Sequence, residues 1–347
     1  MKLVLWPAAR IFEAIARARV ALYMRGRLRR RRLGAPVISV GNLSAGGTGK
    51  TPFVIWLFQQ LCGRGMRPAV LTRGYGRDDR RQTLLLMDRA EPAEGAGDEV
   101  RLMLRHGVAP IGVDADRFRA GLALKTRADV FLLDDGFQHL ALKRDFDIVL
   151  VDCSRLPWED DLLPAGRLRE PPSALARAAA IVLTRVQKWT PLDAIRQRVR
   201  RWNSDAAIYV ARTRLIDPAP KETALAFAAV GNPKAFVADL CLAGARVVAR
   251  RAFPDHHRYS LADLRALERQ AEAAGAETLL TTEKDDVNLP AAVRARLGLP
   301  LRVIRMELDV EDGGALVDSA LEVAARSRQQ AGGRTQQAGG SQAPSAI

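Results

Sequence analysis

A glycine-rich segment in the first part of the chain, GNLSAGGTGKTP at residues 41–52, has the composition and spacing of a phosphate-binding loop. It follows the apolar run PVISV and leads into FVIWLFQQL, so we expect it where a buried strand passes into a helix. Glycines at such a junction let backbone N–H groups converge on phosphate oxygens at the positive end of the helix. The residues predicted to bind nucleotide phosphates are Gly46, Gly47, Thr48, Gly49, Lys50 and Thr51.

Within this loop, Lys50 and Thr51 have the most specific predicted roles. Lys50 is expected to contact the β- and γ-phosphates, and the Thr51 hydroxyl to bind Mg²⁺. Pro52 is compatible with a helix start, because the first turn does not need its missing N–H. The usual pattern G-x-x-x-x-G-K-[ST] has Ser44 in place of its first glycine, and an ordinary glycine-rich turn is the alternative interpretation.

A second group of polar residues follows the apolar run VFLL, where Asp134 and Asp135 occupy the end of an expected buried strand. Open α/β sheets bind ligands at the carboxyl ends of their strands, and P-loop enzymes hold an acidic partner of Mg²⁺ there. Two adjacent carboxylates are costly at such a position without a cation. We therefore predict a Mg²⁺ site formed by Thr51, Asp134 and Asp135. The alternative is a helix N-cap, which accounts for one aspartate more easily than for two.

Transfer of a phosphoryl group to an alcohol needs a side chain that accepts the hydroxyl proton. The chain has four histidines as candidates, His106, His139, His256 and His257. His139 follows the acidic strand end in DDGFQH, and the adjacent pair lies in FPDHHRY. A histidine oriented by an aspartate is a suitable base, whereas a surface loop or a helix cap is the alternative for the Asp-His-His segment.

Short apolar runs alternate with helical stretches along most of the chain, which predicts an α/β fold with a doubly wound parallel sheet. The first set of expected strands is PVISVG (36–41), PAVLTRG (68–74), VFLLDDG (130–136), DIVLVD (147–152) and AAIVLTR (179–185). After the prolines of RLIDPAP, the second set is ALAFAAVGN (224–232), RVVARRAF (246–253), ETLLTTEKD (277–285) and LRVIRMEL (301–308). We therefore predict a large lobe over residues 35–217 and a second, smaller α/β lobe over residues 218–327. Residues 328–347 are rich in Gln, Gly, Ser and Ala without periodicity, and are predicted to be a disordered tail.

The formal net charge of +15 predicts an anionic partner, for which nucleotide phosphates, nucleic acid and an anionic membrane surface are all suitable. Residues 1–34 hold ten Lys or Arg residues and a single acid, Glu13. In this segment Ile11, Ile15, Ala18 and Leu22 fall on one helical face, which predicts an amphipathic helix at a membrane interface. A solvated helix packed on its own domain is the alternative. No apolar run reaches the roughly 20 residues needed to span a bilayer, and the arginines lack the interleaved aromatic residues that stack on nucleic acid bases.

Seven motifs of the chain occur in the order seen in the tetraacyldisaccharide 4'-kinase (lipid A 4'-kinase) family. They are VGNLSAGGTGKTP, LTRGYGR, GDE (97–99), DDGFQH, LLPAGRLREP (162–171), FPDHHRY and TTEKD. The chain resembles this family from the N-terminal helix to about residue 310. The resemblance implies a P-loop NTPase-like kinase of two α/β lobes with a cleft between them, attached to the cytoplasmic face of the inner membrane by its N-terminal helix. The implied reaction transfers the γ-phosphate of ATP to the 4'-hydroxyl of tetraacyldisaccharide 1-phosphate, which forms lipid IVA in lipid A biosynthesis.

The resemblance also implies roles for individual residues. It places the family's catalytic pair on Asp98 and His256, with Lys50 as the lysine of the P-loop, and the Mg²⁺-site acids on Asp134 and Asp135. In this hypothesis the second lobe brings His256 to Asp98 when the cleft closes, and closure excludes water. The residues that fall in motifs lining the cleft are Arg73, Gln138, His139, Arg169 and Glu170. Arg73 and Arg169 are suited to neutralising phosphate charge, with a structural salt bridge as the alternative for each.

Two segments depart from the family pattern. Val100 stands where the motif GDEP has its proline, and Trp158, Glu159 and Asp160 replace a Gly-Asn-Gly before LLPAG. Asp98 itself is retained, so these departures bear on loop geometry near the acceptor more than on the chemistry.

The expected partners are the lipid A disaccharide 1-phosphate precursor and an anionic membrane surface, with ATP as substrate and Mg²⁺ as cofactor. Neither nucleic acid nor an obligate protein partner is expected. Three widely separated cysteines indicate neither a disulfide framework nor a zinc site and favour a reducing compartment. Two alternatives from other classes are a P-loop regulatory or assembly NTPase that acts through a protein partner, and a nucleic-acid-dependent ATPase.

Overall fold

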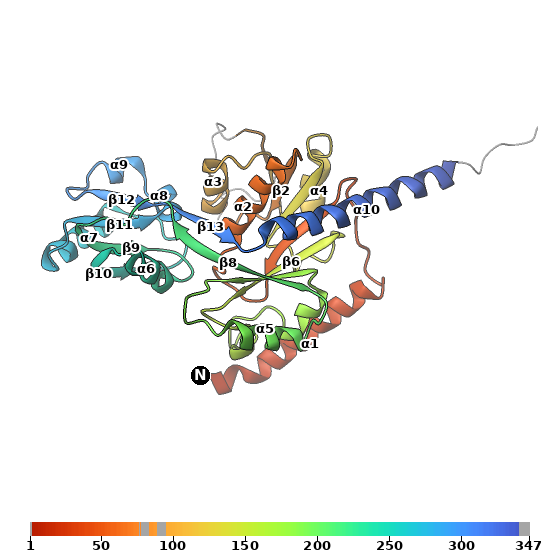
Figure 1. Ribbon diagram of the computed structural model, residues 1–347, viewed down its shortest axis with the longest axis horizontal. Helices are drawn as coiled ribbons and strands as arrows, with labels where there is room; N and C mark the ends of the chain where they lie inside the picture. The colour runs from red at the N-terminus through yellow and green to blue at the C-terminus, as the bar shows by residue number, and fades with distance from the viewer. Residues whose placement is uncertain (1, 76, 78–82, 89–94, 340–347) are drawn as a thin grey trace, which may run out of the picture.

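The computed structural model describes residues 2–75, 77, 83–88 and 95–339, which form two α/β lobes of unequal size joined by two strands (Figure 1). The chain begins with helix α1 (Lys2–Met24) and builds most of the large lobe. It then forms the small lobe and returns to the large lobe, where it ends in helix α10 (Gly313–Gly339).

The large lobe is organised by a sheet to which the described residues contribute nine strands. In spatial order the strands are β13 (Met306–Val310), β8 (Ala207–Leu215), β7 (Ala180–Thr184), β6 (Phe146–Asp152), β1 (Val37–Asn42), β5 (Val130–Asp134), β2 (Pro68–Thr72), β4 (Ile111–Val113) and β3 (Leu84–Leu86). The pairs from β8 to β4 are parallel, and only the outermost pairs, β13 with β8 and β3 with β4, are antiparallel. The mostly parallel sheet confirms the predicted fold class.

Helices cover both faces of this sheet, because successive residues of the buried central strands point to opposite sides. On one face, Ile38 and Val40 of β1 pack in a cluster with α2 (Lys50–Gly63), α3 (Asp98–Arg105) and α10. On the other face, Val37 packs in a cluster with α4 (Arg117–Ala123). The remaining elements of the large lobe are α5 (Leu192–Arg200) and the short 3₁₀ helices η1 (Pro157–Glu159) and η2 (Pro172–Arg177).

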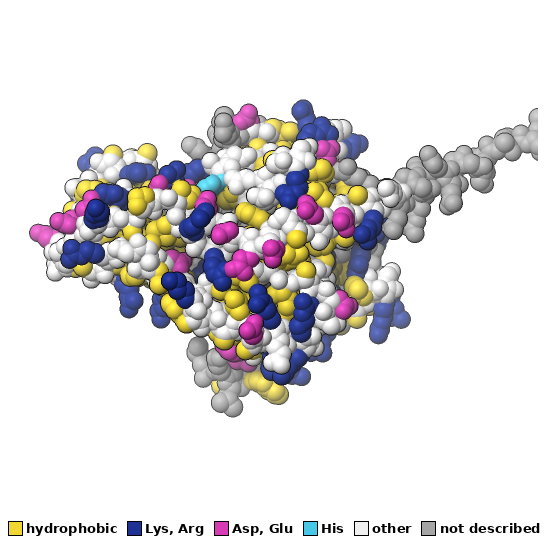
Figure 2. Space-filling model, viewed as in Figure 1, with side chains coloured by type: hydrophobic (Ala, Val, Ile, Leu, Met, Phe, Trp, Pro, Cys, Tyr) yellow, Lys and Arg dark blue, Asp and Glu magenta, His cyan; other side chains and the backbone are white. Residues whose placement is uncertain are grey.

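The small lobe has its own parallel sheet, to which the described residues contribute four strands. In spatial order these are β10 (Arg246–Ala252), β9 (Thr223–Ala228), β11 (Thr278–Thr282) and β12 (Leu301–Ile304). The helices of this lobe are α6 (Pro233–Leu242), α7 (Leu261–Ala273), α8 (Glu283–Val287) and α9 (Ala291–Arg294). Basic and acidic side chains are interspersed over both lobes on the face shown in Figure 2.

The end of the chain differs from the prediction in two ways. The run LRVIRMEL was expected to form one strand of the second lobe, but the structure divides it between β12 in the small sheet and β13 in the large one. The reason is packing, since Ile304 is buried in the small-lobe core whereas Val310 and Leu316 are buried in the large-lobe core. The small lobe therefore ends near Ile304, and residues 306–327 belong to the large lobe.

The second difference concerns the tail, which was predicted to be disordered from residue 328. The structure instead continues α10 to Gly339, and residues 340–347 lie outside the described residues. The first part of α10 is fixed by the buried side chains of Leu316, Val317 and Ala320. The Gln, Ala and Arg residues that follow have favourable helix propensities, which offset part of the cost of Gly332 and Gly333.

Helix α1 carries the residues of the predicted apolar face on its exposed side. Ile11 and Ile15 are each 63% exposed, and Leu22 is also exposed. The opposite side contains Glu13, which is buried and forms ion pairs with Arg10 and Arg17. Among the helices of the described residues, none is both long enough and apolar enough to cross a membrane.

Candidate active site

A cavity of about 780 Å³ lies between the two lobes. The large lobe contributes the glycine-rich loop and the carboxyl ends of β2, β5 and β7 to its lining. The small lobe contributes the segments that follow β9, β10 and β11, namely residues 230–232, 255–256 and 282–284. The carboxyl ends of both parallel sheets therefore face the same cavity, which is where open α/β sheets bind ligands.

The glycine-rich loop connects β1 to α2 and contains two glycines with positive φ angles. Gly46 and Gly49 have φ angles of 104° and 86°, a backbone region that residues with a Cβ rarely adopt. Helix α2 begins at Lys50 immediately after Gly49, so its first N–H groups lie at the loop. Lys50 Nζ donates to Asn42 Oδ1 over 3.1 Å and lies 3.5 Å from Asp135 Oδ1. The loop therefore has the strand–loop–helix placement predicted for a P-loop, with its lysine beside the end of β5.

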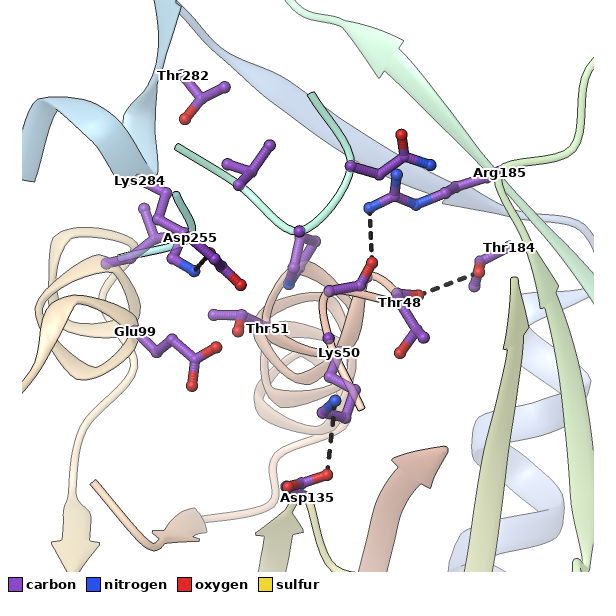
Figure 3. Close-up of a pocket in the computed structure, with 18 of the residues that line it drawn as sticks. Thr48, Lys50, Thr51, Glu99, Asp135, Thr184, Arg185, Asp255, Thr282 and Lys284 are labelled. Carbon is purple, nitrogen blue, oxygen red and sulfur yellow. Dashed lines mark hydrogen bonds and ion pairs between the residues drawn. The ribbon is translucent and has the colours of Figure 1, made fainter. Parts of the chain in front are cut away.

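Side chains at the carboxyl end of β7 and directly after it bind the backbone of this loop. The Thr184 hydroxyl donates to the carbonyl oxygen of Thr48 over 3.1 Å, and Arg185 Nη2 donates to that of Gly47 over 2.9 Å (Figure 3). The small lobe also contacts the loop, since a Cβ built on Gly231 would lie 2.3 Å from the backbone nitrogen of Gly47. Only glycine permits this approach of the two lobes.

The predicted metal residues, Asp134 and Asp135, lie at the end of β5 below the loop. Asp134 Oδ2 accepts a hydrogen bond from Thr72, whereas its Oδ1 is buried without a hydrogen-bond partner. Burial, together with the charges of Glu99 and Asp135, raises the pKa of Asp134. Burial also favours a higher pKa for Asp135. The charges of Lys50 and Arg169 have a larger effect, so the pKa of Asp135 is lowered.

These aspartates supply the oxygen ligands that Mg²⁺ prefers, and the unpaired buried oxygen of Asp134 fits a cation nearby. Within the described ranges no group of three or more His, Cys, Asp or Glu side chains is arranged as a metal site. A Mg²⁺ ion here would therefore take its other ligands from the hydroxyl of Thr51, nucleotide phosphates and water.

Asp98 and His256, which are 158 residues apart in the chain, meet beside the cavity, and His256 lines it. Asp98 is the first residue of α3, and His256 follows β10 in the small lobe. His256 Nδ1 lies 2.8 Å from each carboxylate oxygen of Asp98. The φ angle of His256 is +63°, a conformation that costs a non-glycine residue about 1–3 kcal/mol and persists only where the surroundings hold it.

The contact between the two residues lowers the pKa of Asp98 and raises the pKa of His256, so the charged form of each is favoured. Burial favours a higher pKa for Asp98, but the hydrogen bond from His256 and the charge of Lys284 outweigh it, so the pKa is lowered. The hydrogen bond to Asp98 raises the pKa of His256 against the opposing effect of its partial burial. His256 lines the cavity, whereas Asp98 is only 5% exposed. The imidazole is therefore the member of the pair presented to a bound substrate.

Two small-lobe residues that the sequence did not single out also surround Asp98. Lys284 Nζ lies 3.7 Å from Asp98 Oδ2 and 3.0 Å from Asp255 Oδ1, and the Asn288 amide donates to Asp98 Oδ2 over 3.1 Å. Figure 3 shows Lys284 and Asp255 facing Glu99 across a gap beside Thr51. Lys284 lies in the motif TTEKD directly after a buried strand, which is the same positional signal that identified Asp134 and Asp135.

The five residues predicted to line the cleft divide into two groups. Arg73, Gln138 and Arg169 line the cavity, and Arg169 Nη1 lies 2.7 Å from Asp135 Oδ2. Glu170 is instead buried away from the cavity, where it accepts hydrogen bonds from Gln138 and from Arg177. The side chains of neighbouring residues in an extended segment point in opposite directions, so Arg169 and Glu170 cannot both face the ligand.

His139 also lies outside the cavity lining, in contrast to the prediction. Its carbonyl oxygen accepts a hydrogen bond from Arg144, and its backbone N–H closes a turn onto Gly136. Burial and the nearby charges of Arg117 and Arg144 lower the pKa of His139 to about 4. His139 is thus neutral near pH 7, and its position supports the loop after β5 instead of a substrate.

A P-loop at the carboxyl end of a parallel sheet, with an Asp–His pair beside the same cavity, defines a two-lobed P-loop phosphotransferase. The family model for Tetraacyldisaccharide-1-P 4'-kinase (LpxK) matches residues 1–323. The chain belongs to this family.

Individual proteins support the same assignment. The tetraacyldisaccharide 4'-kinase of Anaeromyxobacter dehalogenans is 40% identical over 329 residues, which cover 89% of this chain and 87% of that protein. The enzyme of the same name from Koribacter versatilis is 38% identical over 331 residues, which cover 92% of this chain and 98% of that protein. A crystal structure of LpxK from Aquifex aeolicus, an "apo" form in complex with ATP, matches with a TM-score of 0.72 at 29% identity and covers 93% of this chain and 99% of that one. The family resemblance seen in the motifs is confirmed, and it favours a kinase over a regulatory NTPase.

Proposed function

We propose that this chain transfers the γ-phosphoryl group of ATP to the 4'-hydroxyl of tetraacyldisaccharide 1-phosphate, forming lipid IVA in lipid A biosynthesis. The observation that carries the proposal is the Asp98–His256 pair, which faces the P-loop across one cavity. A P-loop alone is common to many NTPases, whereas a paired general base is the feature that phosphorylation of an alcohol needs.

The phosphate end of the cavity provides charge and positioning. The N–H groups of the loop and the start of α2 face the phosphates of ATP, and Lys50 neutralises charge on the transferred group. Thr51, Asp134 and Asp135 would hold Mg²⁺, which supplies Lewis-acid stabilisation of the phosphate oxygens when bound. Arg73 and Arg169 add positive charge at the same cavity.

The acceptor end provides the base. A carboxylate only accepts hydrogen bonds, so the Nδ1 atom of His256 that contacts Asp98 carries the proton. Nε2 of the neutral ring, which lies 3.8 Å from Asp255 Oδ2, is then the nitrogen that can accept one. In the transfer, the 4'-oxygen of the sugar attacks the γ-phosphorus, the bond from that phosphorus to the bridging oxygen of ADP breaks, and the hydroxyl proton passes to His256 Nε2. Asp98 orients the ring and stabilises the imidazolium that forms.

The test is incubation of the purified protein with γ-labelled ATP, Mg²⁺ and tetraacyldisaccharide 1-phosphate in detergent micelles, followed by separation of lipid from free phosphate. The wild type should label the lipid, and Asp98→Ala and His256→Ala should each lower kcat by about 10²–10⁴-fold while nucleotide affinity stays nearly unchanged. His257→Ala is the matched control, since His257 contacts Asp263 and not the cavity. Label found only in free phosphate would contradict the proposal, and near-normal turnover of Asp98→Ala would remove that residue from the mechanism.

We further propose that α1 holds the enzyme on an anionic membrane at the cytoplasmic face, where ATP and the lipid substrate meet. The support is the exposed apolar side of α1, with Ile11 and Ile15, and the basic residues that follow in RGRLRRRR. The double substitution Ile11→Glu, Ile15→Glu should reduce flotation of the protein with vesicles that contain anionic lipid. Val248→Glu, at a 46% exposed position of the small lobe, should float as the wild type does. Undiminished flotation of the double variant would place the membrane contact elsewhere.

A further inference from the structure

The side chain of Asn288, which lies outside the motifs named above, connects the small lobe to the carboxylate of Asp98. Asn288 directly follows α8, and its Nδ2 donates to Asp98 Oδ2 over 3.1 Å. Both residues are buried, with exposed fractions of 8% for Asn288 and 5% for Asp98. A hydrogen bond to a buried charge contributes more than an exposed one, because water does not readily replace it.

Arg101 holds the other end of the same amide. Its Nη2 donates to Asn288 Oδ1 over 2.7 Å, and its Nη1 donates to the carbonyl oxygen of Val287. Arg101 follows Asp98 by three residues in α3, and residues at this spacing lie on one face of a helix. A single face of α3 therefore binds both ends of the Asn288 side chain.

The chemistry of the two partners allows only one orientation of this amide. A guanidinium group only donates hydrogen bonds and a carboxylate only accepts them, so the amide oxygen must face Arg101 and the NH₂ group must face Asp98. An aspartate at position 288 would place a second carboxylate against Asp98, and a leucine would contact neither partner by hydrogen bonding. Asparagine is thus matched to the site in shape and in polarity.

We propose that Asn288, fixed by Arg101, is a positioning residue for proton transfer. This inference rests on the proposed function: Asn288 holds the carboxylate of Asp98 in the orientation that accepts Nδ1–H of His256. Because Asn288 lies on the small lobe and both Asp98 and Arg101 lie on α3, the carboxylate is held in this way only when α8 is docked against α3. The base is therefore completed by the same contact that brings the lobes together.

The interface between α3 and α8 also supplies a matched control. Arg105 Nη1 lies 2.7 Å from Asp286 Oδ2, one turn further along α3 and without a contact to Asp98. If the interface only held the lobes together, loss of Arg105 and loss of Asn288 would have similar effects. If Asn288 positions the base, the two losses have different effects.

The experiment measures lipid phosphorylation, with kcat and the KM for ATP determined separately, for the wild type and for Asn288→Leu, Asn288→Asp and Arg105→Ala. Asn288→Leu should lower kcat by about 10–100-fold, the range expected for one hydrogen bond to a charged group, with little change in KM. Asn288→Asp should lower kcat at least as much, since it adds a like charge. Arg105→Ala should stay within about twofold of the wild type, because the Arg105 side chain is 40% exposed and Asp286 keeps Arg294 as a partner.

A double-variant comparison separates positioning from general damage to the fold. In the Asp98→Ala background no carboxylate remains to be positioned, so Asn288→Leu should cause no further loss of kcat. A further loss in that background, an equal loss in Arg105→Ala, or wild-type kcat in Asn288→Leu would each overturn the inference while leaving the kinase intact. A wild-type protein that labels no lipid would instead overturn the proposed function, and the inference with it.

Discussion

The two ends of the cavity are assembled in different ways. At the phosphate end, the loop of residues 41–52 and the aspartates after β5 come from the large lobe and are positioned by adjacent parallel strands. At the acceptor end, Asp98 belongs to the large lobe, but the side chains that donate to it, His256 and Asn288, both belong to the small lobe. The residues proposed to bind phosphate and Mg²⁺ therefore come from one lobe, whereas the proposed base needs side chains of both.

This difference suits a kinase whose acceptor is an alcohol. If the lobes separated, the nucleotide-binding lobe would lack the proposed base and would have little means of activating water. In the structure the lobes are docked, and the Asp98–His256 contact is formed beside the cavity. The contact between Gly47 and Gly231 shows that docking also touches the phosphate loop, so the two ends are not fully independent.

The largest expected effect comes from removing the lysine of the phosphate end. Lys50→Ala should lower kcat/KM by at least about 10²–10³-fold, because it deletes a preorganised charge at the transferred group. Steady-state kinetics with labelled ATP measures this loss. Lys188→Ala, an exposed lysine of the same lobe, is the control. A Lys50→Ala enzyme with near-normal kcat/KM would show that the loop does not act on the γ-phosphate.

A smaller effect is expected where the small lobe touches the phosphate loop. A Cβ at Gly231 would lie 2.3 Å from Gly47 N, so Gly231→Ala must separate the lobes or displace the loop. Overpacking of this kind costs about 1–3 kcal/mol, which corresponds to a loss of kcat/KM of roughly 5–150-fold. Gly298→Ala, where the added Cβ meets its nearest atom at an ordinary 3.4 Å, should leave kcat/KM unchanged. Equal behaviour of the two variants would mean that the two ends of the cavity do not interact through this contact.

The pH dependence of His256 tests whether the base is assembled in solution. Because Asp98 stabilises the imidazolium, the pKa of His256 should lie above the usual 6.5 for histidine. The neutral base should then form, and kcat should rise, as the pH increases through that raised value. NMR titration, with the signal assigned through His256→Gln, should show a lower pKa in Asp98→Asn. An unshifted pKa in the wild type would mean that the lobes are undocked in the absence of ligands.

The smallest effect should come from an ion pair that lies within the small lobe. Arg302 Nη2 pairs with Glu222 Oε1, and the two side chains are 51% and 43% exposed. Arg302→Ala should lower the free energy of unfolding by at most about 1 kcal/mol and leave kcat unchanged, since solvent screens such pairs. Urea unfolding and turnover measure both quantities. A clear loss of kcat would show that the small lobe transmits changes at its edge strand β12 to the proposed base.

Part of the site was predictable from the sequence because it depends on neighbouring residues. The phosphate loop, Lys50 and the strand-end aspartates follow from glycine conformations, helix starts and apolar runs that are all visible over a few residues. The Asp98–His256 pair did not follow from spacing, since its members are 158 residues apart, and it was identified only through the family resemblance. Asn288 and Arg101 were missed altogether, because an asparagine after a short helix carries no local signal of a partner on another lobe.

Local sequence patterns also did not predict which side chains face the cavity, or where the chain passes from the small sheet back to the large one. His139 and Glu170 lie in the expected motifs but not in the cavity lining, because which side of the chain faces the ligand depends on how the segment packs. The run 301–308 has the composition of one strand, yet its two halves belong to different sheets.

What the sequence by itself determined was the class of fold and the phosphate-binding chemistry, since backbone freedom and alternating apolar runs act over short distances. What only the tertiary structure decided was the proposed base, because His256 and Asn288 of the small lobe reach Asp98 of the large lobe. Such contacts join residues across 158 and 190 positions of the chain, where no local preference specifies the partner.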